Sequence, residues 1–131
     1  MSSPEFSIIE EFFASRAGGP NESLVLGIGD DCAVIDVPSD KQIAVSTDTL
    51  VENVHFLENS EPELLGHKVL AVNLSDLAAM GASPAWASLA ITLPAIDKAW
   101  LASFAKGFFE LAERYSLQLI GGDTTRGPLS I

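Results

Sequence analysis

Aspartates follow short apolar runs at three places in the chain, and this repetition is the most informative chemical pattern in it. The runs lead into Asp31, Asp48 and Asp123, the first and third through pairs of glycines. Adjacent carboxylates repel one another unless a cation or a proton lies between them, so a strand that ends in glycine and aspartate suits a hard metal ion. One such turn alone is ordinary, but its recurrence predicts a shared site.

A fourth acid, Asp76, lies in a helical pattern that is apolar nearly all round between residues 70 and 80. A buried carboxylate is costly unless it is paired or binds metal. If Asp31, Asp48, Asp76 and Asp123 converge, their charges require divalent cations. Ligand sets made only of oxygen favour magnesium, calcium or manganese over zinc.

Hydroxyl, amide and guanidinium groups beside these acids extend the chemistry. Ser46, Thr47 and Thr49 offer further oxygen ligands. The backbone at residues 121–122 can approach a phosphate closely, and Arg126 is a candidate phosphate contact. No P-loop motif is present, and lysines are few, so we expect metal to neutralise bound phosphates. Such a site suffices for phosphoryl transfer.

Three other reactive side chains give weaker signals. Cys32 follows the acidic pair without a local base, which favours a structural role over a nucleophilic one. His55 is either a substrate contact or a satisfied strand histidine, and the residues leave both readings open. His67 lies in a helical pattern and is expected to be structural or exposed.

Composition narrows the class of protein. The chain has 131 residues with 18 acidic and 7 basic side chains, a formal charge of -11, which disfavours nucleic acid as a partner. One cysteine excludes an internal disulfide and fits a reducing, cytoplasmic compartment. We expect no signal peptide and no membrane span. Residues 127–131 resemble a turn and the start of a strand, so we expect a single domain, residues 1–131, cut from a longer protein.

The elements that must position these residues alternate in type, which predicts an α+β (α/β layered) domain with helices on one face of a small mixed sheet. A hairpin over residues 32–47 would bring Asp31 and Asp48 to the same end. The apolar second face of the sheet needs a cover, for which a partner subunit is the natural candidate. Ser3 and Pro4 predict the start of a helix from 3 to 17, with Phe6, Ile9 and Phe13 on one face. A strand from 24 to 26 follows, then a helix from 61 to 80 that begins with Pro62, and a strand from 85 to 93. Asp97 is expected to cap a helix from 97 to 115 whose apolar stripe is Trp100, Leu101, Phe104, Phe108, Leu111, Ala112 and Tyr115. The last expected strand runs from 117 to 120 and is followed by a loop to 127.

Taken together, these residues resemble the N-terminal domain of the thiamine-monophosphate kinase family, within the aminoimidazole-ribonucleotide-synthetase-like superfamily. The likeness covers essentially the whole chain. Its motifs are Glu5-Phe6, Gly27-Ile28-Gly29-Asp30-Asp31-Cys32, Ser46-Thr47-Asp48-Thr49, His55-Phe56, the sequence from Ala71 to Ala82, and Gly121-Gly122-Asp123-Thr124-Thr125-Arg126-Gly127.

The resemblance implies transfer of the ATP γ-phosphate onto thiamine monophosphate, giving thiamine diphosphate. It implies ATP contacts at Gly122 and Asp123 and a thiamine-phosphate contact at His55. A tyrosine often found near the nucleotide is replaced by Phe109. The implied Mg2+ ligands are Asp31, Ser46, Thr47, Asp48, Asp76 and Asp123.

The family also implies a homodimer whose N-terminal sheets pair into a β-barrel, and a second domain that this chain lacks. We therefore expect the fragment alone to be inactive or nearly so. The alternatives are another superfamily member, such as selenophosphate synthetase or the hydrogenase-maturation dehydratase, and a non-catalytic module for dimerisation or metal binding. Substrate assays separate the first, and magnesium titration with and without ATP separates the second.

Overall fold

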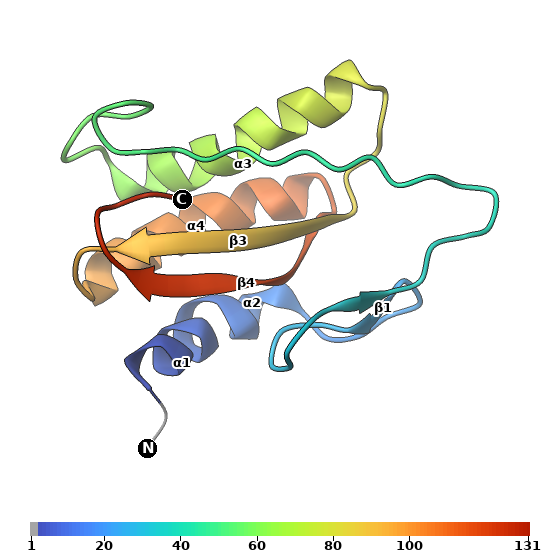
Figure 1. Ribbon diagram of the computed structural model, residues 1–131, viewed down its shortest axis with the longest axis horizontal. Coiled ribbons are helices and arrows are strands. Elements are labelled where there is room, and N and C mark those ends of the chain that lie inside the picture. Colours follow the sequence, from blue (N-terminus) through green and yellow to red (C-terminus); the bar gives the residue numbers. More distant parts are fainter. Residues whose placement is uncertain (1–2) are drawn as a thin grey trace.

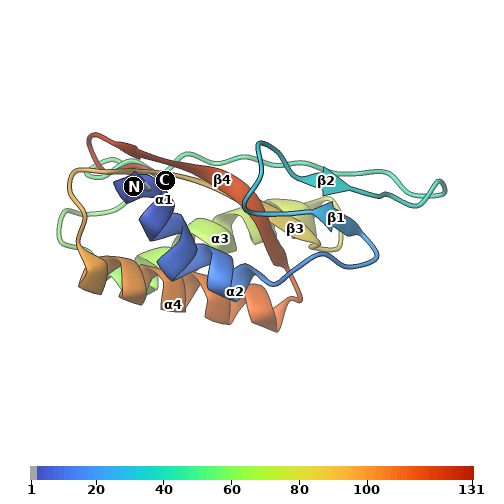
Figure 2. The same ribbon diagram turned by 90° about the horizontal axis from the view of Figure 1, so that it is seen from below.

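Two long helices cover one face of a pair of parallel strands (Figures 1 and 2). The computed structural model describes residues 3–131. Residues 1–2, where the sequence predicts no signal peptide, lie outside the described part. The elements are α1 (Pro4–Ile8), a π-helical turn η1 (Ile9–Ala14), α2 (Ser15–Ala17), β1 (Leu24–Leu26), β2 (Val34–Ile35), α3 (Pro62–Ala79), β3 (Trp86–Leu93), α4 (Lys98–Arg114) and β4 (Gln118–Arg126).

The first helical stretch begins and ends as the sequence predicts, and Phe13 of its expected apolar face is buried. The Ser3 side chain accepts a hydrogen bond from the amide of Phe6, and the stretch ends before Gly18. The expected buried stripe included Phe6, which is exposed. Because η1 is a π turn, residues five apart share its face. Ile8 and Phe13 therefore enter the core together.

The helices α3 and α4 pack closely because each carries a glycine at the crossing. A Cβ atom on Gly66 would lie 2.1 Å from the carbonyl oxygen of Phe104, and one on Gly107 would lie 1.9 Å from that of Glu63. Only hydrogen fits at these points. The backbones of the two helices are thus in direct contact, and this fixes the position of α3 over the sheet.

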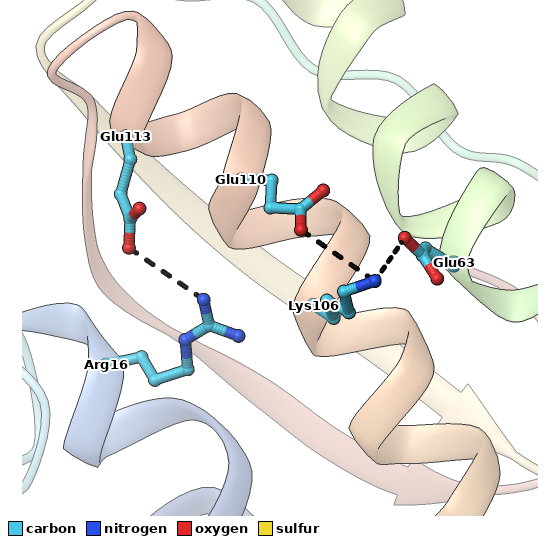
Figure 3. Close-up of polar contacts among 5 residues, drawn as sticks. All are labelled: Arg16, Glu63, Lys106, Glu110 and Glu113. Atoms are coloured by element: carbon cyan, nitrogen blue, oxygen red, sulfur yellow. Dashed lines mark hydrogen bonds and ion pairs between the residues drawn. The ribbon is translucent and has the colours of Figure 1, made fainter.

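Charged side chains at the edges of this helical layer add exposed ion pairs (Figure 3). Lys106 of α4 donates to Glu63 of α3 at 2.8 Å. That hydrogen bond, together with the charges of Glu63 and Glu110, raises the pKa of Lys106. Arg16 lies 3.8 Å from Glu113 and over the ring of Phe109. Exposed pairs of this kind contribute little to stability.

The core lies between the helices and the strands and is rich in aromatic rings. The predicted apolar stripe of α4 is confirmed, because Leu101 and Phe104 are fully buried, although Tyr115 at its end is half exposed. Phe109 is also buried and meets Phe108 edge to face at 5.2 Å. Phe109 is therefore a core residue in this structure.

The predicted hairpin over residues 32–47 is wrong. β2 pairs antiparallel with β1, and from 42 to 49 no backbone group is hydrogen-bonded to another within residues 3–131. The turn at its centre is present, since the amide of Lys41 donates to the carbonyl of Pro38. Residues 42–49 continue away from β2 and run along β3 in the layer of the strands (Figures 1 and 2).

Two other expectations need correction. Residues 121–126 form the second half of β4 rather than a loop, because they pair in register with residues 88–93 of β3. The second half of α3 is not buried: Asp76 is exposed, and Met80, which caps the helix, is 78% exposed. The apolar composition of that stretch predicts burial, but it does not identify an element that would cover the helix.

The end of the chain joins the sheet. Ser130 forms both hydrogen bonds of an antiparallel pair with Thr92, and Ile131 forms both with Leu50. Residues 129–131 thus lie between β3 and the segment that follows residue 49. The expected small α/β domain with its helices on one face is confirmed; no helix among residues 3–131 is long and apolar enough to cross a membrane.

We predict that Gly107→Ala lowers the free energy of unfolding by about 2–3 kcal/mol, because the new methyl group overlaps the backbone of α3. Helix propensity alone favours alanine by about 1 kcal/mol, the opposite sign. Urea denaturation measures the change. Gly19→Ala is the matched control, since nothing lies within 4 Å of a Cβ there. Equal stability of the Gly107 variant and the unchanged chain would contradict the packing described.

Candidate functional site

A cavity of about 600 Å3 lies between β3, residues 43–50 and α3, and several predicted site residues line it. Ser46, Thr47 and Asp48 contribute from one side and Asp123 from β4. Asn73 of α3, which sequence reasoning did not assign to the site, also lines it. Its signal was the spacing of three residues from Asp76, which places both on one face of the helix.

Ser46 and Asp76 meet directly. The Ser46 hydroxyl donates to Oδ2 of Asp76 at 3.1 Å, which connects the extended segment to α3. Alternate residues of an extended chain share a face, so Asp48 lies on the same side as Ser46. The structure therefore brings together a hydroxyl and a carboxylate, with a second carboxylate two residues along.

The other two acids are not gathered with this pair. Asp123 pairs in register with the exposed Ala90, whereas the neighbouring Ile91 is buried against the helices. Asp123 therefore points away from the helical layer. Asp31 follows β1 in an irregular turn, is exposed and does not line the cavity.

The predicted convergence of all four carboxylates is thus not met. Among residues 3–131 no three His, Cys, Asp or Glu side chains form a group that could hold a metal ion. The physical reason is that strand alternation and the missing hairpin separate Asp123 and Asp31 from the acid on α3. What remains close is the pair of Ser46 and Asp76.

His55 is exposed, lies outside this cavity and is held in one orientation. Its Nδ1 accepts a hydrogen bond from the amide of Val51 at 2.9 Å, so the ring carries its proton on Nε2. Lys68 of α3 donates to the carbonyl oxygen of His55. The turn closes through Asn53, which has a positive φ of 62°. The free end of the ring is therefore an Nε2–H donor.

Gly122 and Arg126 both belong to β4. A Cβ on Gly122 would lie 1.8 Å from the carbonyl oxygen of Leu89, so the pairing of β3 with β4 itself requires glycine there. Arg126 is exposed and lines a second cavity, of about 350 Å3, beside α1, with Pro4 and Ile96. Arg126 and Asp48 thus lie in different cavities. Cys32 is exposed and has a free thiol.

Residues 29–131 match the family described as AIR synthase related protein, N-terminal domain. The chain belongs to this family. The match includes every predicted site residue from Asp31 to Arg126, and its start falls within the glycine-aspartate turn.

Among curated members, the chain is 55% identical over all 131 residues to thiamine-monophosphate kinase of Escherichia coli K12. It is 48% identical to thiamine-monophosphate kinase of Stenotrophomonas maltophilia K279a, whose crystal structure superposes with a TM-score of 0.83 over 99% of this chain. A structure of AaThiL complexed with AMPPCP and TMP is 33% identical, with a TM-score of 0.60 over 63% of the chain. The chain spans 40% of the length of the Escherichia coli kinase.

We predict that nitrogen-15 NMR of the histidine rings at about pH 8, where unperturbed imidazoles are neutral, finds His55 with its proton on Nε2. The amide of Val51 occupies Nδ1 and excludes the other tautomer. His67, exposed on α3, is the internal control and should show exchange between tautomers. A proton on Nδ1 of His55 would contradict the geometry.

Proposed function

We propose that the full-length protein transfers the terminal phosphate of ATP onto thiamine monophosphate and releases ADP and thiamine diphosphate. The observation that carries this proposal is the 55% sequence identity, over all 131 residues, to the thiamine-monophosphate kinase of Escherichia coli K12. The complex with AMPPCP and TMP supports both ligands, because it superposes on part of this chain. Since this chain spans 40% of such a kinase, the activity is proposed for the longer protein.

We propose Mg2+ as the metal, and the donor chemistry fits it. Ser46, Asp48 and Asp76 offer only oxygen, the ligand type that magnesium prefers. The hydrogen bond between Ser46 and Asp76 already places two of these groups side by side. Asp31, Thr47 and Asp123 remain proposed ligands whose approach requires parts of the protein beyond those described. Bound magnesium would offset the charge of the phosphates, which 7 basic residues cannot do alone.

The chain's own groups then position the substrates. The Nε2–H of His55 is a fixed donor for an acceptor on thiamine monophosphate, and it needs no reorientation because Val51 and Lys68 hold the turn. Gly122 and Asp123 are consecutive exposed residues of β4, where a nucleotide can approach. Arg126 is a proposed phosphate contact at the end of the same strand.

A homodimer and a cytoplasmic location complete the proposal. The segment beyond residue 41 exposes Ile43 at 48% and Val45 at 83%, and apolar surface of this kind marks contact with another chain or segment. The free thiol of Cys32 fits a reducing compartment.

We predict that Asp76→Asn in the full-length protein lowers kcat/KM for thiamine diphosphate formation about a hundredfold or more and raises the magnesium concentration needed for half-maximal rate. Chromatographic quantification of thiamine diphosphate measures both. Asp40→Asn, in the exposed turn before the extended segment, is the matched control and should leave both unchanged. No formation of thiamine diphosphate by the unchanged protein would overturn the proposed function; full activity of the Asp76 variant would overturn only the metal assignment.

A further inference from the structure

The turn that carries His55 is built largely from its own backbone. The amides of Val54 and His55 both donate to the carbonyl oxygen of Val51, and the amide of Asn53 donates to that of Phe56. The amide of Val51 in turn donates to Nδ1 of the His55 ring. The ring is thereby fixed relative to the turn, so its direction in the molecule depends on how the turn is attached to the rest of the domain.

Both ends of this turn are attached to the body of the domain. On one side the amide of Glu52 donates to the carbonyl oxygen of Leu129. On the other side Phe56 is 8% exposed and belongs to the hydrophobic core. The tip between them is not held by packing, since Val54 is 72% exposed and His55 is exposed as well. The tip therefore needs a polar attachment if the imidazole is to keep one direction.

Lys68 of α3 provides that attachment. Its ammonium donates to the carbonyl oxygen of His55. Within residues 3–131, this is the one hydrogen bond that joins residues 53–55 to an element outside residues 51–58. An ammonium donor makes a charge-assisted bond, which is stronger than a bond between neutral groups. Lys68 forms no ion pair with a described carboxylate, so none competes for this donor.

The part of α3 from which Lys68 extends is well supported. Leu65 and Val69, close to it along the helix, are buried. Gly66 lies where the backbones of α3 and α4 are in contact, since a Cβ atom there would lie 2.1 Å from the carbonyl oxygen of Phe104. The side chain of Lys68 thus joins the exposed tip of the turn to a helix segment that is packed on α4.

The same helix carries the other half of the candidate site. Asp76 of α3 accepts a hydrogen bond from the Ser46 hydroxyl. Residues 68 and 76 are about 12 Å apart along the axis of α3, because an α-helix rises about 1.5 Å per residue. The helix therefore sets the spacing between the turn that bears His55 and the pair of Ser46 and Asp76.

We propose that Lys68 is a positioning residue for the substrate contact at His55. It fixes the peptide of His55 to α3, so that the Nε2–H donor is presented at one distance and in one direction from the pair of Ser46 and Asp76. Lys68 acts through His55 rather than by touching the substrate. The inference rests on the proposed function for the identity of the substrate, thiamine monophosphate, whereas the attachment of the turn can be tested without it.

Steady-state kinetics of the full-length protein tests the role in substrate binding. We expect Lys68→Met, which keeps the apolar stem and removes the donor, to raise KM for thiamine monophosphate about tenfold or more, because a displaced contact binds poorly. KM for ATP should not change, since the proposed nucleotide contacts Gly122 and Asp123 lie on β4. Lys68→Arg restores a charged donor and should recover most of the loss. Lys41→Met removes an equal charge from an exposed turn and is the matched control.

Hydrogen exchange of the same variants separates positioning from direct contact and needs no substrate. The amide of Val51 donates to Nδ1 of His55. We expect this amide to exchange about tenfold or more faster in the Lys68→Met protein, because the turn opens more often once its tip is released. The amide of Phe104, within the buried part of α4, is the internal control and should exchange at an unchanged rate.

The two readouts together decide the proposal. A raised KM for thiamine monophosphate with unchanged exchange at Val51 would mean that Lys68 contacts the substrate directly, and it overturns the positioning role. An unchanged KM overturns that role whatever the exchange rate. If the unsubstituted protein forms no thiamine diphosphate, the proposed function fails by itself, and exchange at Val51 still decides whether Lys68 holds the turn.

Discussion

The interaction on which the site depends is the hydrogen bond from the Ser46 hydroxyl to Oδ2 of Asp76. Residues 42–49 are largely exposed, and none of their backbone groups bonds to another backbone group within residues 3–131. Ser46 is therefore held beside α3 by its own side chain and by the nearby pairing of Leu50 with Ile131.

The helical layer supplies the rigid half of the arrangement. Gly66 and Gly107 let α3 and α4 touch through their backbones, and the buried rings of α4 hold both helices against the strands. Asp76 is therefore carried by a well-supported element, although its own turn of α3 is exposed. Ser46, by contrast, lies on a segment that is tied down at Leu50 and at the turn near Lys41. The site joins a carboxylate on a well-packed helix to a hydroxyl on a segment that makes no backbone pairing from residue 42 to residue 49 among the described residues.

Local patterns predicted the elements that depend on local physics. Caps and proline positions gave the starts of α1, α3 and α4, and helical periodicity gave the core face of α4. The failures involve pairing between distant segments. The turn at 38–41 suggested a hairpin, but β2 pairs backwards with β1, and no local signal distinguishes these partners. β4 continues through Gly121 and Gly122 because β3 supplies their hydrogen-bond partners. From composition alone, the two glycines predict a loop.

In the candidate site, too, local patterns predict some features, whereas others depend on contacts between distant segments. The contact of Ser46 with Asp76 and the inclusion of Asp48 and Asp123 in one cavity lining were within reach of motif spacing. The direction of each side chain was not, because strand alternation places Asp123 on the face away from the helices. The orientation of His55 depends on a backbone amide four residues earlier and on Lys68, neither of which a motif specifies. The resemblance named the residues, whereas the structure shows which of them this part of the protein can hold together.

The central claim is the proposal that α3 and residues 43–50 together form one metal site. The most direct measurement is a crystal structure of the full-length protein grown with Mn2+ and AMPPCP, with the metal located by its anomalous scattering. The account predicts an ion coordinated by Asp76 and by at least one of Ser46 and Asp48. A metal held by neither Asp76 nor the segment, or a bound nucleotide phosphate with no ion beside it, would contradict the account.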